Sequence, residues 1–142
     1  MAFNVLIVDD SLPMRSVIKK TIVMSGFKVG QFFEASNGAE ALDVLRTEWL
    51  DLVLTDYNMP VMNGLELMGE MKRDDVMDSI PVVVVTTEGS QKMVSEFLKE
   101  GAADYIQKPF TPEEIRGKLN RILGEEEDGE DAADRGDEDL DF

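Results

Sequence analysis

The sequence predicts an α/β protein with a doubly wound, five-stranded parallel sheet and five helices. Short apolar runs alternate five times with longer segments whose apolar residues recur at helical spacing. Such alternation forms a parallel sheet covered on both faces, because right-handed crossovers bring each helix back onto the sheet. The pattern spans only residues 1–124, which is too short for a closed barrel of eight strand–helix units.

The five predicted strands are short apolar runs, typical of strands that are buried on both faces. The fourth is the clearest, because its sequence PVVVVT consists almost entirely of β-branched residues. In chain order the predicted strands are Phe3–Val8, Val29–Glu34, Leu50–Thr55, Pro81–Thr86 and Asp104–Gln107.

The first two predicted helices begin at side chains that can accept hydrogen bonds from the free amide groups of a helix start. Ser11 stands two residues before Pro13, which favours a first helical turn, and Gly26 ends the helix. Asn37 is followed three positions later by Glu40, which is a capping-box pattern for the second helix.

The remaining three helices show comparable start and stop signals. The third follows a turn that contains Asn63-Gly64, and the fourth lies between Ser90 and Gly101. The fifth begins at Thr111–Glu114, which combines an N-cap, a proline at the first helical position and a capping-box glutamate. It ends at Gly124.

Helical spacing also predicts which side chains of these helices face the core. In chain order they are Met14, Val17, Ile18, Thr21, Ile22, Ala41, Leu42, Leu45, Leu65, Leu67, Met68, Met71, Val94, Phe97, Leu98, Ile115, Leu119 and Ile122. We expect Trp49, near the end of the second helix, to be packed against its neighbours as well.

The composition excludes several kinds of active site. The chain has no cysteine and no histidine, so it offers no thiol nucleophile, disulfide or imidazole acid–base group. Any metal would be bound by oxygen atoms, which select hard cations such as Mg²⁺ or Ca²⁺. A formal net charge of −16 disfavours binding to nucleic acid. No apolar run reaches the ~20 residues of a membrane span, and the N-terminus lacks a signal-peptide pattern. We therefore expect a cytoplasmic protein without membrane insertion.

Charge divides the chain into two parts. Residues 1–124 hold 19 acidic and 13 basic residues, whereas residues 125–142 hold eleven acidic residues and one basic residue. The second part has too few apolar residues to offset the entropy of ordering. We therefore expect a globular domain over 1–124 and an acidic C-terminal tail over 125–142, either disordered or an extension of the last helix. The tail serves either solubility or an interaction, with Leu140 and Phe142 as weak anchors.

Charged and polar residues stand at the ends of four predicted strands. Asp9 and Asp10 follow the first strand, Asp56 follows the third, Thr86 ends the fourth and Lys108 follows the fifth. Because the carboxyl ends of parallel strands meet at one edge of a sheet, we expect these residues to converge. Crowded carboxylates disfavour one another's ionisation, which a divalent cation and a lysine would relieve. The pattern predicts a Mg²⁺ site that retains some water.

The chain resembles the receiver domains of response regulators, and among them the single-domain regulators of chemotaxis. The resemblance is carried by the segments LIVDDS, LTDYNMPVMNGLEL, VVVTTEG and GAADYIQKPF, and it spans about residues 3–123. It implies a flavodoxin-like sheet with strand order 2-1-3-4-5 and a cis peptide bond between Lys108 and Pro109.

The resemblance also assigns roles to particular residues. Asp56 is implied as the phospho-acceptor, with Lys108 and Thr86 holding phosphoryl oxygens. The implied metal ligands are Asp9, Asp10, Asp56 and the backbone carbonyl of Asn58, and the implied switch residues are Thr86 and Tyr105.

The implied function is that of a two-component response regulator, in which Mg²⁺-dependent phosphorylation of Asp56 switches a protein-binding face. The donor would be a sensor histidine kinase, and the downstream partner a protein, with the flagellar switch as a candidate. The chain would not be an enzyme, beyond its own phosphorylation and dephosphorylation chemistry. A phosphorelay intermediate or phosphate sink without motor binding stays open as the alternative. The basic residues of the last two helices form either an ordinary solvated face or a docking face; they are Lys92, Lys99, Arg116, Lys118 and Arg121.

Overall fold

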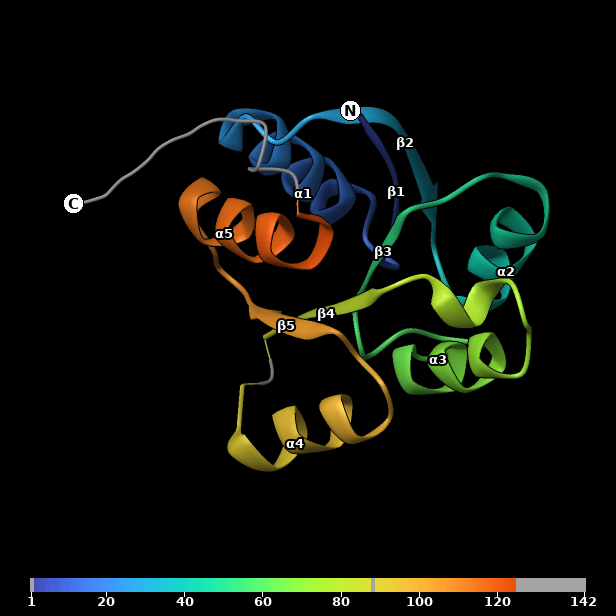
Figure 1. Ribbon diagram of the computed structural model, residues 1–142. Helices are drawn as coiled ribbons and strands as arrows, with labels where there is room; N and C mark the ends of the chain where they lie inside the picture. The colour runs from blue at the N-terminus through green and yellow to red at the C-terminus, as the bar shows by residue number, and fades with distance from the viewer. Residues whose placement is uncertain (1, 88, 125–142) are drawn as a thin grey trace.

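The computed structural model describes residues 2–87 and 89–124, so the predicted acidic tail lies outside the described residues. Strands and helices alternate through this part of the chain, as Figure 1 shows. In chain order the elements are β1 (Phe3–Val8), α1 (Leu12–Ser25), β2 (Val29–Ala35), α2 (Gly38–Thr47), β3 (Leu52–Thr55), α3 (Gly64–Lys72), the short 3₁₀ helix η1 (Met77–Ser79), β4 (Val82–Thr86), α4 (Gln91–Lys99), β5 (Asp104–Gln107) and α5 (Pro112–Leu123).

The predicted fold class is confirmed. The five strands form one sheet in the order β2-β1-β3-β4-β5, and every neighbouring pair is parallel. The order reverses beside β1, so the carboxyl ends of β1 and β3 flank the crevice in which such sheets bind ligands.

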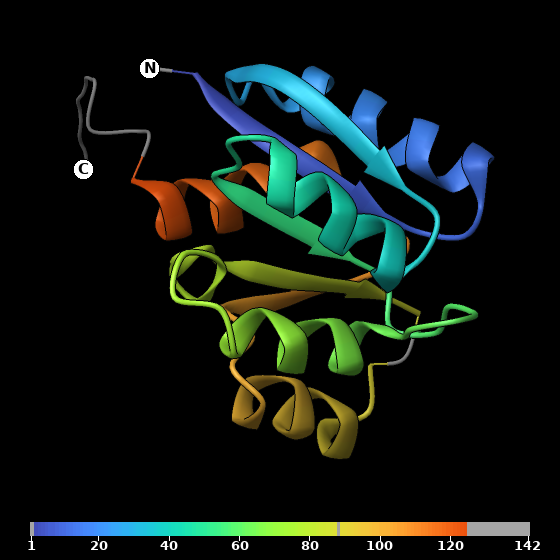
Figure 2. The same ribbon diagram turned by 90° about the vertical axis from the view of Figure 1, so that its right-hand side faces the viewer.

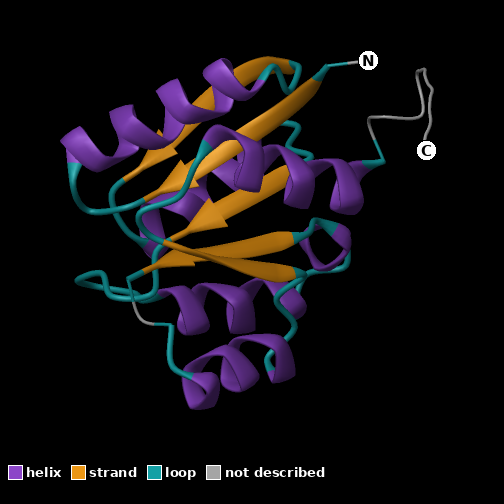
Figure 3. Ribbon diagram, turned by 90° about the vertical axis from the view of Figure 1, so that its left-hand side faces the viewer, coloured by secondary structure: helices purple, strands orange, loops and turns teal. Residues whose placement is uncertain are grey.

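Helices cover both faces of the sheet, and each face has its own core. Residues of α1 and α5 pack on one face, where Val5 and Ile7 point from β1. Residues of α2, α3 and α4 pack on the other, where Leu6 and Val8 point from β1. Figures 2 and 3 view the molecule from two opposite sides and show these layers. Alternate residues of a strand point to opposite faces, so both faces of β1 are apolar.

The predicted helix starts are confirmed by the capping contacts. In all five α-helices an N-cap side chain accepts a hydrogen bond from a backbone amide within the first turn. These N-cap residues are Ser11, Asn37, Asn63, Ser90 and Thr111. Each cap satisfies an amide that the helix itself cannot pair, which positions the loops that precede the helices.

Three predicted core residues are exposed instead. Val17 is 51% exposed, Leu98 is 48% exposed and Trp49 is 80% exposed. Val17 precedes the buried Ile18 and Leu98 follows the buried Phe97. Successive positions on a helix point about 100° apart, so both exposed residues fall outside the narrow buried stripe. Trp49 lies in the loop before β3, and its ring is left largely uncovered. None of the described helices is both long and apolar enough to cross a bilayer.

Candidate functional site

Three carboxylates meet at the carboxyl ends of β1 and β3. One oxygen each from Asp9, Asp10 and Asp56 lie within 4.8 Å of one another. The sheet sets this proximity, because the Asp9 amide donates to the Ala35 carbonyl of β2 (3.0 Å) and the Asp56 amide donates to the Val8 carbonyl of β1 (2.9 Å). The acids therefore continue the strand register and converge on one edge, as the sequence predicts.

Lys108 reaches this cluster from the end of β5. Its Nζ lies 3.2 Å from Oδ2 of Asp9 and 3.6 Å from Oδ2 of Asp56. Its backbone amide donates to the Thr86 carbonyl over 2.8 Å, and the Lys108-Pro109 bond is cis, as expected. The lysine side chain is only 10% exposed, so its charge is weakly screened by water and offsets part of the repulsion between the acids.

Asp56 occupies an environment that disfavours its charge. Burial raises the pKa of Asp56, and the neighbouring Asp9 carboxylate raises it further, whereas Lys108 and the Tyr57 amide act to lower it. That amide donates to Oδ1 of Asp56 over 2.7 Å, which fixes the orientation of the carboxylate. One lysine does not compensate three crowded acids, so an oxygen-only pocket of this kind suits a hard divalent cation.

The other predicted site residues are Thr86, Tyr105 and Asn58. Thr86 ends β4 beside Gln107 of β5 and is buried, and Tyr105 is partly buried one strand further out. Nζ of Lys118 lies 4.8 Å from the centroid of the Tyr105 ring, a contact that the sequence analysis does not anticipate. Asn58 is exposed in the loop two residues after Asp56.

The loop between β3 and α3 is held by contacts that sequence reasoning missed. The Gly64 amide donates to the Tyr57 carbonyl (3.0 Å), and a Cβ atom on Gly64 would lie 2.6 Å from the Asp56 carbonyl oxygen. The Gly38 amide donates to the Met62 carbonyl (3.0 Å), with the Met62 side chain packed over Gly38. Both glycines thus allow a close backbone approach. The Asn63-Gly64 pair is a visible turn signal, but nothing local in the sequence indicates the Gly38 contact.

Arg15 on α1 also contacts the acidic cluster, and nothing in the sequence pattern indicated this. Its Nη1 donates to the Asp9 carbonyl over 2.6 Å, and its Nε donates to Oε1 of Glu34 over 2.8 Å. Lys19 binds the other oxygen of Glu34. Arg15 therefore supports the backbone of the acidic cluster from α1.

Three of the five bases on α4 and α5 are bound within the molecule. Nη1 of Arg116 donates to the Ser25 carbonyl at the end of α1 over 2.9 Å. Lys118 and Arg121 both contact the Asp104 carboxylate, at 3.1 Å and 3.5 Å. The positive surplus on this face is therefore smaller than a count of its bases indicates.

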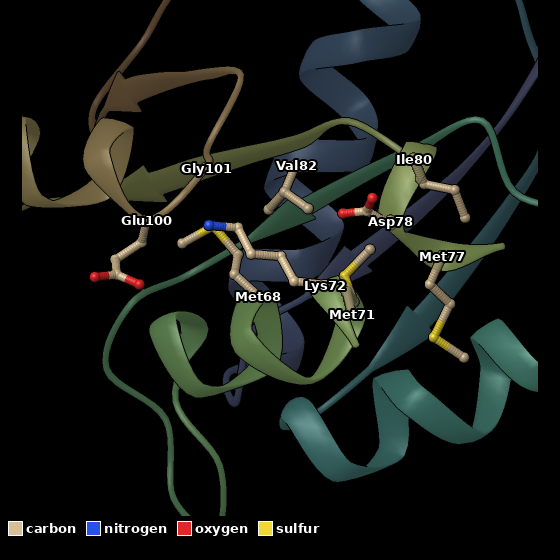
Figure 4. Close-up of a pocket in the computed structure, with 9 residues that line it drawn as sticks. All are labelled: Met68, Met71, Lys72, Met77, Asp78, Ile80, Val82, Glu100 and Gly101. Atoms are coloured by element: carbon tan, nitrogen blue, oxygen red, sulfur yellow. The ribbon is translucent and has the colours of Figure 1, made fainter. Parts of the chain in front are cut away.

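A small cavity of about 50 Å³ lies near the amino end of β4, away from the acidic cluster. Figure 4 shows its lining, in which the thioether side chains of Met68 and Met71 stand beside Lys72, with Met77 further along the cavity. Pockets that bind small molecules have volumes of about 300–1,000 Å³. The cavity is therefore too small for a substrate and does not compete with the acidic cluster as the functional site.

Comparison with known proteins gives a consistent result. The sequence profile of the response regulator receiver domain matches residues 5–120. A chemotaxis protein CheY homolog of Campylobacter jejuni is 42% identical over 122 residues, which are 85% of this chain and 92% of that protein.

Solved structures agree with these matches. The structure of CheY4 of Vibrio cholerae superposes with a TM-score of 0.76 and 32% identity, and the match covers 87% of this chain and 100% of that chain. A chain in the CheX-CheY-BeF3-Mg complex from Borrelia burgdorferi superposes with a TM-score of 0.75 and 26% identity, covering 85% of this chain and 89% of that chain.

Proposed function

The chain belongs to the response regulator receiver family, and from this we propose that Asp56 accepts a phosphoryl group that switches a protein-binding face. The observation that supports this most directly is the position of Lys108, whose ammonium group lies against Asp9 and Asp56 beside a third acid. A buried lysine among carboxylates offers a ready partner for an incoming anionic group.

The proposed chemistry is a transfer of one phosphoryl group to a carboxylate oxygen. An oxygen of Asp56 attacks phosphorus, and the bond from phosphorus to the donor nitrogen or oxygen breaks in line. The products are an acyl phosphate on Asp56 and the free histidine of a kinase, or acetate when acetyl phosphate is the donor. Lys108 and the Thr86 hydroxyl bind oxygens of the transferred group, and water later attacks the acyl phosphate.

We propose Mg²⁺ as the cofactor of this site. Its ligands would be the carboxylates of Asp10 and Asp56 and the backbone carbonyl of Asn58, with Asp9 acting largely through water. When bound, the ion supplies positive charge against the phosphoryl oxygens. The crowding of three carboxylate oxygens within 4.8 Å supports this assignment, and the similar Borrelia burgdorferi complex is described as containing Mg.

We propose that Thr86 and Tyr105 convey the change to the face formed by α4, β5 and α5. Phosphorylation adds roughly −1.5 to −2 charges at the pocket, which draws the Thr86 hydroxyl inward and leaves room for the Tyr105 ring. Lys118, which lies over that ring, must then release it. The switch thus exchanges one cation–π contact for burial of the aromatic ring.

The proposed partners are a sensor histidine kinase as donor and a downstream protein that binds the switched face. The similarity to chemotaxis proteins favours the flagellar switch as that downstream partner. We also propose a cytoplasmic location, no enzymatic turnover of a separate substrate, and a receiver unit over 1–124 that is distinct from the acidic tail. The profile match, which ends at residue 120, supports this boundary.

Intact mass spectrometry after incubation with acetyl phosphate and Mg²⁺ tests the proposed chemistry. We expect an adduct of ~80 Da, the mass of one phosphoryl group, that requires Mg²⁺ and is absent in Asp56→Asn. The matched control Asp43→Asn removes an exposed acid from α2 and should keep the adduct. An adduct of unchanged yield on Asp56→Asn would contradict the proposal.

The alternative function is a phosphorelay intermediate or phosphate sink without motor binding. Phosphorylated protein should bind a flagellar switch peptide more tightly than unphosphorylated protein does. Transfer of the phosphoryl group to a second histidine-containing protein, without such binding, would favour the alternative.

A further inference from the structure

Helix α1 lies in the one long stretch of the chain that has no acidic residue. Residues 11–33 contain four basic residues and no acidic one, although the whole chain holds 30 acidic residues. Three of the bases, Arg15, Lys19 and Lys20, stand on α1 itself. A concentration of positive charge in a strongly acidic protein is a preferred contact for anionic partners.

The outward face of α1 is apolar as well as basic. Val23 is 64% exposed and Met24 is 74% exposed. With Ser16, Lys19 and Lys20 they line a shallow, open hollow of about 520 Å³. We call this surface the α1 face. Exposed apolar side chains flanked by lysines fit a segment that is acidic and carries a few apolar anchors.

The charge of the α1 face is only partly balanced by its neighbours. Arg15 and Lys19 share the single carboxylate of Glu34, at 2.8 Å and 2.7 Å. Lys20 is exposed and makes no salt bridge to any residue in the described ranges.

The face of α4, β5 and α5 is different, because acidic residues lie among its bases. These acidic residues are Glu96, Glu100, Glu113 and Glu114. Arg116, Lys118 and Arg121 are bound within the molecule there, as Arg15 and Lys19 are on the α1 face.

We propose that the acidic tail, residues 125–142, binds the α1 face of the same molecule. The tail carries eleven acidic residues and one basic residue, with Leu140 and Phe142 as apolar side chains able to cover Val23 and Met24. It follows α5, which packs beside α1 on the same face of the sheet (Figure 1). Eighteen extended residues reach up to about 60 Å, whereas α1 is about 21 Å long.

This contact covers a surface that leads from the end of α1 toward the acidic cluster. Leu12, at the start of α1, is 60% exposed and directly follows the loop that holds Asp9 and Asp10. The charges and exposure of α1 favour this contact whether or not Asp56 is phosphorylated.

Paramagnetic relaxation in the full-length protein tests the proposal. The chain has no cysteine, so Ala133→Cys carries a single nitroxide label in the tail. We expect amide signals of residues 16–24 to lose at least half of their intensity, and those of 91–99 to keep theirs. In ~1 M NaCl, where the Debye length is ~3 Å, the lost intensity should return.

Two surface variants test which face is bound. Lys20→Glu combined with Met24→Ser should abolish the broadening of the α1 signals. The matched control on α4, Lys99→Glu combined with Leu98→Ser, also replaces one exposed lysine and one exposed apolar residue and should leave the broadening intact.

Three results would overturn the proposal. The first is broadening that centres on α4 or α5, and the second is broadening that is absent or spread evenly over the domain. The third is α1 broadening that appears when labelled protein is mixed with a separate isotope-labelled copy, since the tail would then bind a second molecule.

Discussion

Nζ of Lys108 lies 3.2 Å from Oδ2 of Asp9, although 99 residues separate the two in the chain. Both side chains are almost fully buried, with 10% and 3% of their surfaces exposed. The contact joins the end of β5 to the end of β1, past the two strands that lie between them. It makes the acidic pocket a product of strand order, because only parallel strands with aligned carboxyl ends bring these residues together.

Removing the Asp56 charge should stabilise the metal-free protein at pH 7. Burial and the Asp9 carboxylate raise the pKa of Asp56, so its ionised form costs folding free energy there. Asp56→Asn should increase the free energy of unfolding by about 1 kcal/mol, allowing for solvent screening. Urea denaturation with EDTA measures this, and saturating Mg²⁺ should stabilise the wild type more than the variant. A variant less stable than the wild type in EDTA would contradict the expectation.

Val61 should be a source of backbone strain. Its φ is 69°, in the left-handed region that β-branched residues disfavour, and its side chain is 81% exposed. Val61→Gly should raise the free energy of unfolding by about 1 kcal/mol, as relief of strain exceeds the added entropy of the unfolded chain. The matched control Val76→Gly changes another exposed valine, with a φ of −83°, and should lower stability instead. Equal effects of the two substitutions would exclude strain at Val61.

The packing of Met62 over Gly38 should be visible as non-additive stability. A Cβ atom on Gly38 would lie 2.7 Å from Cγ of Met62, so Gly38→Ala should cost about 1–3 kcal/mol. In the control Gly69→Ala the new methyl group meets no atom within 4 Å apart from its chain neighbours and its own helix backbone, and the variant should gain about 0.5–1 kcal/mol. Thermal unfolding of the double variant with Met62→Ala should recover part of the Gly38→Ala loss, and simple additivity would refute the contact.

Glu34 should make stability depend on pH below neutrality. Hydrogen bonds from Lys19 and then Arg15 hold the pKa of Glu34 below its usual value, so the folded state binds fewer protons than the unfolded chain. This contribution is present above pH 4.5, the ordinary value, and is lost as pH falls through the folded pKa. At neutral pH the wild type should exceed Glu34→Gln in free energy of unfolding by less than about 1 kcal/mol, because the ion pair is partly exposed. Urea denaturation at a series of pH values should show this difference disappear as the pH falls through the folded pKa of Glu34. A difference in free energy of unfolding that stays constant down to pH 3 would contradict this role of Glu34.

Local sequence determined the secondary structure and the edge on which the acidic residues meet. Caps such as Ser11 and Asn63 act within one helical turn. The apolar composition of a strand such as Val82–Thr86 is enough to predict that it is buried. Once the strands are parallel, the residues that follow them must share an edge. The convergence of Asp9, Asp56 and Lys108 was therefore predictable without knowledge of any single contact.

Only the tertiary structure decided whether several other side chains are exposed to solvent or bound within the molecule. Trp49 is apolar yet exposed, because no element within residues 2–87 and 89–124 covers that loop. Arg116 is bound to the Ser25 carbonyl instead of facing a partner. The Met62 side chain packs over Gly38, which lies 24 positions earlier in the chain and has no side chain to block it. Periodicity and capping depend on neighbours in sequence, whereas these outcomes depend on which atoms fill the adjacent volume, and that is set only when the whole sheet and its helices have packed.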